Sequence, residues 1–254
     1  MAPGPQVALL PDGRRLHLQH GPIDLLIDAD GPAPAVRAAW QAAEERFRDV
    51  LAVLVEELPA LRRPCPETGV ALNGPVARRM ATAVQPHART YVTPMAAVAG
   101  SVADEMLAAI LAAAPQLKRL HVNNGGDIAL WLAAGQSFVS GIAGPPPQLR
   151  IIDRVLIGAD DGIGGIASSS RHGRSLSLGV ADNVTVFARN AAMADVAATL
   201  IANAVDTGPH PNVKRCPATD LDPDSDLGTR QVTVDVGRLA ADDVGQALGR
   251  GVAQ

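Results

Sequence analysis

The chain has 254 residues, of which 47% are apolar, 2% aromatic and 19% charged, and its formal net charge is −4. So few aromatic residues argue against a surface that stacks single-stranded nucleic acid, and the scattered Lys and Arg residues show no footprint for a nucleic-acid backbone. We expect residues 1–254 to form a single domain around an aliphatic core, either as one body or as two closely joined lobes.

The N-terminus and the cysteines bear on the location of the protein. The first 20 residues lack the basic start, apolar core and small-residue cleavage site of a secretory signal. The apolar runs are broken by charge, Gly or Pro before they reach membrane-spanning length. We therefore expect a cytoplasmic protein with no membrane or nucleic-acid partner. Cys65 and Cys216 match no zinc-binding spacing, and inert thiols are favoured over a disulfide or a reactive role.

The first predicted elements are strands. Residues 7–10 and 14–20 flank a Pro-Asp-Gly turn at residues 11–13, which predicts an opening hairpin. Residues 23–28 are predicted to form a third strand.

Three helices are predicted next. Apolar residues recur at helical spacing over residues 35–58. Asn73 is predicted to cap a short helix that has Pro75 in its first turn. Thr93 and Pro94 start a helix rich in Ala, Gly and Ser that runs to about residue 115.

From residue 117 the pattern changes to short strands at turn-like intervals, and Asn190 then opens a helix. Residues 207–229 are long for a structureless loop, which indicates a functional loop or additional structure. A strand, QVTVDV, and an amphipathic helix from about Leu239 close the chain. Because helices flank a run of mostly consecutive strands, we predict an α+β fold with mixed or antiparallel sheets flanked by helices.

The most informative stretch is residues 162–206. Asp195 and Thr199 are four residues apart in the predicted helix, so they lie on one face a single turn apart. A carboxylate and a hydroxyl, beside a loop rich in hydroxyls and backbone N–H groups, suit a hard cation bound together with a phosphate. The ordinary alternative is that Asp195 only complements the helix dipole.

Three other segments have both an ordinary and a functional interpretation. The NNGGD sequence at residues 123–127 is favoured as a tight turn between strands. Ser168-Ser169-Ser170, which follows two glycines, is equally consistent with a phosphate cradle and with a serine-rich turn. His172, between Arg171 and Arg174, suits an anion contact or a solvated loop.

In chain order, the segments TPMAAVAGSVAD, HVNNGGDIAL, GIAGPP, GIASSS, ADNVTV and NAAMADVAATLIAN resemble the ApbE-like proteins, the FAD:protein FMN transferases. The resemblance covers about residues 91–236 and is greatest to a compact, functionally unassigned branch of that superfamily. No single motif is decisive, but the ordered series is fairly specific.

The resemblance implies an ApbE-like fold, a bound FAD and a Mg²⁺ ion. It assigns the metal to Asp195, Thr199 and a backbone carbonyl of residues 96–98, represented by Ala96. In such a reaction the metal neutralises the diphosphate while FMN moves to a threonine hydroxyl of an acceptor protein and AMP leaves. The residues carried over to the flavin or diphosphate pocket are Asn124, Gly125, Gly126, Asp127, Ser168 and Ser169, and the nearby basic residues are His172 and Arg174.

The chain also departs from the transferases. They carry D-x-G-A-I-A-K-G where this chain has TPMAAVAG at residues 93–100, so the acid and the lysine are missing. Their H-I-I-D-P-x-T-G segment is shortened here to residues 174–179. Three functions stay open: a Mg²⁺-dependent enzyme acting on FAD or another nucleotide diphosphate, an accessory protein that binds a flavin or other anionic cofactor without chemistry, and a different reaction on the same scaffold.

Overall fold

The computed structural model describes residues 4–144, 150–173 and 175–254. It has an α+β fold with antiparallel sheets and flanking helices, as the sequence predicts. The chain divides into two compact units. The first unit comprises Met1–Ser140, Arg154–Ala167 and Phe187–Asp195, and the second comprises Gly141–Asp153, Ser168–Val186 and Val196–Gln254.

The main sheet has the strand order β1-β2-β3-β4-β5-β8-β9. The pairs from β1 to β5 and the β5–β8 pair are antiparallel. The Asp12 carboxylate accepts the backbone N–H groups of Arg14 and Arg15, which fixes the predicted turn of the opening hairpin. The strands are β1 (Gln6–Leu9), β2 (Arg15–His20), β3 (Ile23–Asp30), β4 (Arg119–Asn124), β5 (Asp127–Leu132), β8 (Gly165–Ser169) and β9 (Val184–Ala188).

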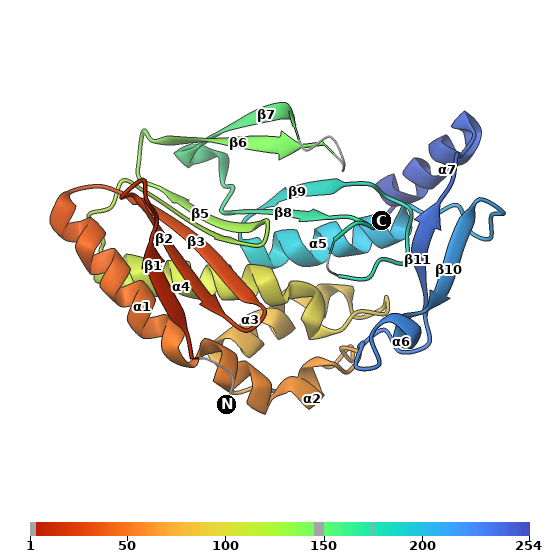
Figure 1. The fold of residues 1–254 in the computed structure, drawn as a ribbon, viewed down its shortest axis with the longest axis horizontal. Helices are drawn as coiled ribbons and strands as arrows, with labels where there is room; N and C mark the ends of the chain where they lie inside the picture. The colour runs from red at the N-terminus through yellow and green to blue at the C-terminus, as the bar shows by residue number, and fades with distance from the viewer. Residues whose placement is uncertain (1–3, 145–149, 174) are drawn as a thin grey trace. The chain divides into compact units, whose positions relative to one another are not determined.

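The helices of the first unit pack on this sheet through aliphatic side chains. α1 contacts β2 and β3, and α4 contacts β4, β5, α1 and α3 (Figure 1). Small residues of α1, such as Ala39 and Ala43, recur on its buried face at a spacing of four, so the helix lies close to its neighbours. The elements are α1 (Ala33–Glu56), α2 (Leu58–Leu61), α3 (Pro75–Val84), η1 (Gln85–His87), η2 (Pro94–Ala97) and α4 (Val98–Ala113).

Two predicted helix starts differ in detail from the structure. The N-cap of α3 is Gly74 rather than Asn73. The carboxylate of Glu57 accepts the backbone N–H groups of both residues, at 2.8 Å for Asn73 and 2.7 Å for Gly74, so a distant side chain supplies the acceptor. The helix predicted from Thr93 begins as the 3-10 turn η2 and becomes α-helical only at Val98.

The stretch Pro94–Ala113 is long and apolar enough to cross a membrane by length and composition, with a mean hydropathy of 1.6. The stretch is not an uninterrupted apolar run, because the charged residues Asp104 and Glu105 lie within it, as the sequence argument requires. In the structure, α4 packs in the hydrophobic core of the first unit. Met106 and Ile110 are fully buried, and the helix carries Asp104 and Glu105, which bind groups of the surrounding fold.

Glu105 joins three helices through its carboxylate. Arg46 of α1 donates to one oxygen at 2.9 Å and Arg79 of α3 donates to the other at 3.0 Å, while the Glu105 side chain is only 13% exposed. Burial raises the pKa of Glu105, but the hydrogen bonds and charges of the two arginines outweigh it and hold the pKa below its ordinary value of 4.5. The ion pairs of Glu105 with Arg46 and Arg79 therefore stabilise the fold above pH 4.5, where the carboxylate is ionised.

We expect Glu105→Gln to lower the free energy of unfolding by about 2 kcal/mol at pH 7, between the values for exposed and buried ion pairs. Because the folded-state pKa is lowered, the contribution of Glu105 is present above pH 4.5 and is lost as the pH falls through the folded-state pKa. Urea unfolding at pH 7 and pH 3 measures both effects. The control is Glu44→Gln, whose exposed pair with Arg48 at 3.9 Å should contribute under about 1 kcal/mol. Equal losses for the two variants would contradict the bridge.

The remaining elements include two further two-stranded sheets, β6-β7 and β10-β11. Residues 207–229 contain β10 and α6, so the prediction of additional structure in this long segment is confirmed. In the second unit, the small core includes Val180, Val205 and Ala247. The elements are β6 (Ser137–Ala143), β7 (Ile151–Gly158), η3 (Ala159–Asp161), α5 (Ala191–Ala204), β10 (Val213–Pro217), α6 (Ala218–Leu221), β11 (Gln231–Val236) and α7 (Ala241–Val252).

Candidate functional site

The site in the first unit is built where α4 and α5 begin, and two glycines allow their close approach. A Cβ placed on Gly100 of α4 would lie 2.3 Å from the carbonyl oxygen of Ala191. A Cβ on Gly165 of β8 would lie 2.1 Å from the carbonyl carbon of Asn190. Neither position has room for a side chain, so the backbones of α4, β8 and the start of α5 are in direct contact.

The two helices cap each other with aspartates. Asp104 of α4 is buried and accepts the N–H groups of Ala191 and Ala192, the first two residues of α5, at 3.0 and 2.9 Å. Asp195 of α5 accepts the N–H of Gly100 in the first turn of α4 at 3.0 Å. Each carboxylate satisfies amides that have no partner inside their own helix. Sequence reasoning missed Asp104, because its partners lie 87 and 88 residues away.

Electrostatic repulsion is concentrated on Asp195. Burial raises its pKa well above the ordinary value, and the nearby charges of Asp127 and Asp104 raise it further, while the N–H groups of Gly100 and Ala99 oppose the shift. Burial also raises the pKa of Asp104, against the hydrogen bonds from Ala192 and Ala191. An isolated negative charge is therefore unfavourable at Asp195, and a cation placed there would relieve the repulsion.

The NNGGD segment reaches the same place. Asn124, at the end of β4, is buried, and its Nδ2 donates to the carbonyl oxygen of Ala99 at 3.1 Å. Gly125 and Gly126 have positive φ values of 65° and 115°, and the N–H of Gly126 donates to Asn123 Oδ1 at 2.8 Å. The prediction of a tight turn is confirmed, and Asn124 and Asp195 meet at the residues Ala99 and Gly100.

The other predicted metal ligands lie in η2 and in α5. Ala96 lies in η2, just before α4, and its N–H donates to the carbonyl of Thr93. Thr199 lies one turn after Asp195 along α5 and belongs to the second unit. Among the residues that the structure describes, no group of three or more His, Cys, Asp or Glu side chains is placed to hold a metal ion. The predicted ligand set contains only one such side chain.

The predicted hydroxyl loop is a strand. Ser168 and Ser169 are the last two residues of β8, so the expectation of a loop is wrong for them. Ser168 Oγ lies 2.9 Å from Thr185 Oγ1, and His172 Nε2 lies 3.2 Å from Asp182 Oδ1. These contacts lie within the second unit. Arg174 lies outside the described residues.

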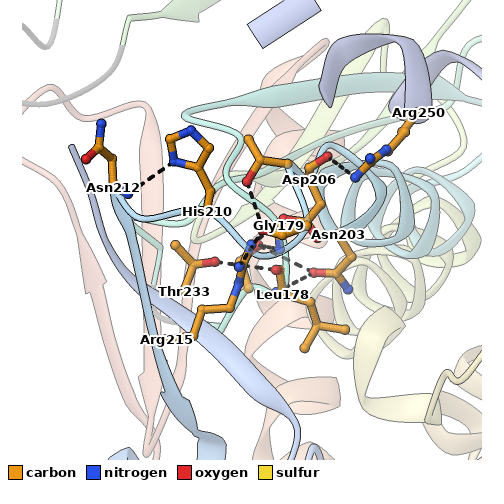
Figure 2. Close-up of polar contacts among 12 residues, drawn as sticks. Leu178, Gly179, Asn203, Asp206, His210, Asn212, Arg215, Thr233 and Arg250 are labelled. Carbon is orange, nitrogen blue, oxygen red and sulfur yellow. Dashed lines mark hydrogen bonds and ion pairs between the residues drawn. The ribbon is translucent and has the colours of Figure 1, made fainter. Parts of the chain in front are cut away.

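Leu178 and Gly179, in the segment between β8 and β9, pack against α5, a role that the sequence did not reveal. Figure 2 shows the Asn203 side chain beside the backbone of Leu178 and Gly179, where Asn203 Oδ1 accepts the N–H of Leu178 at 2.9 Å. A Cβ on Gly179 would lie 2.0 Å from the carbonyl oxygen of Ala202. This segment therefore seats the C-terminal end of α5.

Both cysteines are free, and Cys65 is buried. Burial raises the pKa of the Cys65 thiol, which lowers its reactivity. The prediction that the two cysteines form no disulfide is confirmed.

Comparison with known proteins gives one family. The family model described as "AbpE bacteria" matches residues 7–254. The chain is 38% identical over 133 residues to a UPF0280 protein of Methanococcus vannielii. This alignment covers 49% of this chain and 50% of the relative. It is also 38% identical over 146 residues to a UPF0280 protein of Methanothrix thermoacetophila, and this alignment covers 56% of each of the two chains. The matches thus span about half the length of these relatives. Because the family match extends over nearly the whole chain, the protein belongs to the AbpE bacteria family.

Proposed function

We propose that the first-unit site binds a Mg²⁺–diphosphate ligand, with FAD as the first candidate, as in the ApbE-like proteins that the sequence resembles. One observation carries this proposal. Asn124 binds the carbonyl of Ala99 and Asp195 binds the N–H of Gly100, so three separate segments of the resemblance meet on two adjacent residues.

The residues fit a hard dication. Asp195 of the first unit supplies a carboxylate. The resemblance to ApbE-like proteins adds the hydroxyl of Thr199, one turn further along α5, and the backbone carbonyl of Ala96 in η2. Oxygen ligands of this kind suit Mg²⁺, which keeps several waters and is commonly completed by substrate phosphates. The raised pKa of Asp195 agrees with this choice, because a bound dication would stabilise the ionised carboxylate beside Asp127.

The turn beside these groups leaves open space at Gly126. A Cβ on Gly126 would meet no atom within 4 Å, so a ligand can approach the backbone there without meeting a side chain. When bound, Mg²⁺ would neutralise charge on the diphosphate. The chain's own contribution is to hold the Asp195 carboxylate in place through Gly100 and to fix the start of α4 through the bond from Asn124 to Ala99.

A second function is non-catalytic binding of a flavin or another anionic cofactor. It is favoured by the lack of an available basic side chain, among the described candidates, to act on the phosphate. Ala99 stands where the transferases carry their lysine. Three nearby basic residues are candidates to replace it: Arg171 and His172 both bind Asp182, and Arg174 lies outside the described residues. An assay that detects AMP separates this function from the transferase or hydrolase function.

The test is a titration with FAD, with and without Mg²⁺, followed by flavin fluorescence and by analysis for AMP. We expect Mg²⁺-dependent binding that Asp195→Asn weakens by about tenfold or more, equivalent to about 1.4 kcal/mol. Asparagine can still accept the N–H of Gly100, so this variant should remain folded. Thr199→Val should also weaken binding, and Thr199→Ser, which keeps the hydroxyl, should preserve it.

Each other outcome has a definite meaning. Mg²⁺-dependent binding without AMP, also in the presence of a threonine peptide acceptor, would favour the accessory function. If Asp195→Asn lowers stability while binding is unchanged, Asp195 is only a helix cap. If FAD does not bind with Mg²⁺ present, the flavin proposal is wrong.

A further inference from the structure

A cavity lies among residues of the second unit, and none of its lining residues belongs to the site proposed above. Its volume is about 500 Å³, within the range of about 300–1,000 Å³ typical of small-molecule pockets. Most of its lining is aliphatic, and the polar lining side chains are Arg171, Asp182 and Arg238. The aliphatic lining residues are Val180, Ala181, Val205, Val236, Leu239, Val244, Ala247 and Leu248.

Helix α7 forms one wall of the cavity and is anchored at its two ends. Near its start, Asp243 pairs with His210 at 3.4 Å. Near its end, Arg250 donates to the carbonyl of Asp206 at 2.8 Å, and a Cβ on Gly251 would lie 2.4 Å from Val205 Cγ2. The close contact at Gly251 holds the end of α7 against the core of the second unit.

The middle of α7 presents apolar side chains that the fold does not cover. Val244 and Leu248 line the cavity and are 41% and 55% exposed. Ala247, between them in sequence, is buried in the core of the second unit. The two larger side chains therefore offer an apolar wall to a ligand.

The polar part of the lining carries an excess of positive charge. Arg171 binds Asp182 Oδ1 through Nε at 3.0 Å and through a terminal nitrogen at 2.9 Å, so these two charges balance. Arg238 adds a second guanidinium. Its backbone is fixed because Asn212 Nδ2 donates to the Arg238 carbonyl at 2.7 Å. Arg238 thus supplies the net positive charge of the lining.

We propose that this cavity binds a small amphipathic monoanion, a carboxylate with an aliphatic body of medium length. The body would pack against Val244 and Leu248, and the carboxylate would bind Arg238. Aliphatic walls with a single net cation fit such a molecule better than they fit a neutral lipid or a polyanion, because the lining has one net charge to neutralise.

The test uses the fluorescent probe 8-anilinonaphthalene-1-sulfonate, an apolar anion, displaced by sodium octanoate, 1-octanol or sodium butyrate. We expect octanoate to displace the probe at about one tenth of the concentration that octanol needs, because only the carboxylate can form a charge-assisted hydrogen bond with Arg238. Butyrate, whose body is too short to cover the apolar wall, should also be weak.

Three variants locate the binding. Arg238→Gln should weaken octanoate by about tenfold and leave octanol unchanged. Leu248→Asp should abolish displaceable binding of the probe. Val252→Asp is the matched control, because Val252 is on the same helix, is 89% exposed and does not line the cavity. Circular dichroism checks that each variant is folded.

The proposal is overturned if the probe does not bind, if octanol competes as well as octanoate, or if Leu248→Asp and Val252→Asp have equal effects. It is also overturned if sedimentation shows a dimer that Leu248→Asp dissociates, since a second copy would then cover α7. None of these results depends on FAD or Mg²⁺, so they leave the proposed function of the first unit untouched.

Discussion

Replacing Gly100 by alanine is expected to lower the free energy of unfolding by about 3 kcal/mol or more, in the upper range for overpacked sites. The new Cβ would lie 2.3 Å from the Ala191 carbonyl oxygen and 2.8 Å from the Ala192 nitrogen. Both obstacles are backbone atoms of α5 and cannot move by a change of rotamer. The helices would have to separate, which would also weaken the bonds of Asp104 and Asp195. Urea unfolding measures the loss.

The matched control is Gly249→Ala. Gly249 lies inside α7, and a Cβ there meets no atom within 4 Å. Alanine should stabilise this helix by about 0.5–1 kcal/mol, because it restricts the unfolded chain more than glycine does. A Gly100→Ala variant as stable as the wild-type protein would show that α4 and α5 are not in backbone contact.

Asp104→Ala is expected to cost about 3 kcal/mol, because it leaves two amides at the start of α5 without their acceptor in a buried place. The bonds to Ala191 and Ala192, at 3.0 and 2.9 Å, are both lost. The stability of Asp104→Asn should lie between that of Asp104→Ala and that of the wild type. Its amide oxygen can accept one of the two N–H groups of Ala191 and Ala192, but its NH₂ group would face the other N–H, which is also a donor. Thermal and urea unfolding measure the series.

The control for Asp104 is Asp242→Ala. Asp242 also lies in the first turn of a helix, α7, but it is exposed, so its loss should cost under about 1 kcal/mol. Similar losses at the two positions would mean that the Asp104 bonds add nothing beyond the helix dipole. Asp104→Ala should also weaken Mg²⁺-dependent ligand binding by displacing α5. Asp195→Asn should weaken binding with little change in stability. The two variants thus separate the role of Asp104, which positions α5, from that of Asp195, the proposed metal ligand.

The order of helices and strands could be predicted from the sequence, because it rests on local patterns. The Pro-Asp-Gly turn at residues 11–13 fixes the first hairpin, and the alternation of buried residues in β3 follows the strand period. Asn190 was correctly placed at the start of α5, where its Oδ1 accepts the N–H of Met193 three residues later. Each of these signals lies within a few residues of the structure that it predicts.

The candidate site was only partly predictable. Helical spacing proposed Asp195 and Thr199, and the resemblance to ApbE-like proteins proposed Asn124; the structure brings Asp195 and Asn124 to the adjacent residues Gly100 and Ala99. Asp104 was missed because an aspartate in an apolar helix has no local signature, and its bonding partners are 87 and 88 residues away. The cap of α3 was misassigned for the same reason, since Glu57 acts from 16 residues before Asn73.

The sequence by itself determined the α+β class and the order of the main elements, and it proposed candidate oxygen donors, since these depend on periodicity and residue chemistry. Only the tertiary structure decided what those residues touch. Gly100 and Gly165 bring three backbones into contact, and that contact makes Asp104 and Asp195 reciprocal helix caps. A contact of this kind is set by the absence of side chains at distant positions, and no local pattern encodes it.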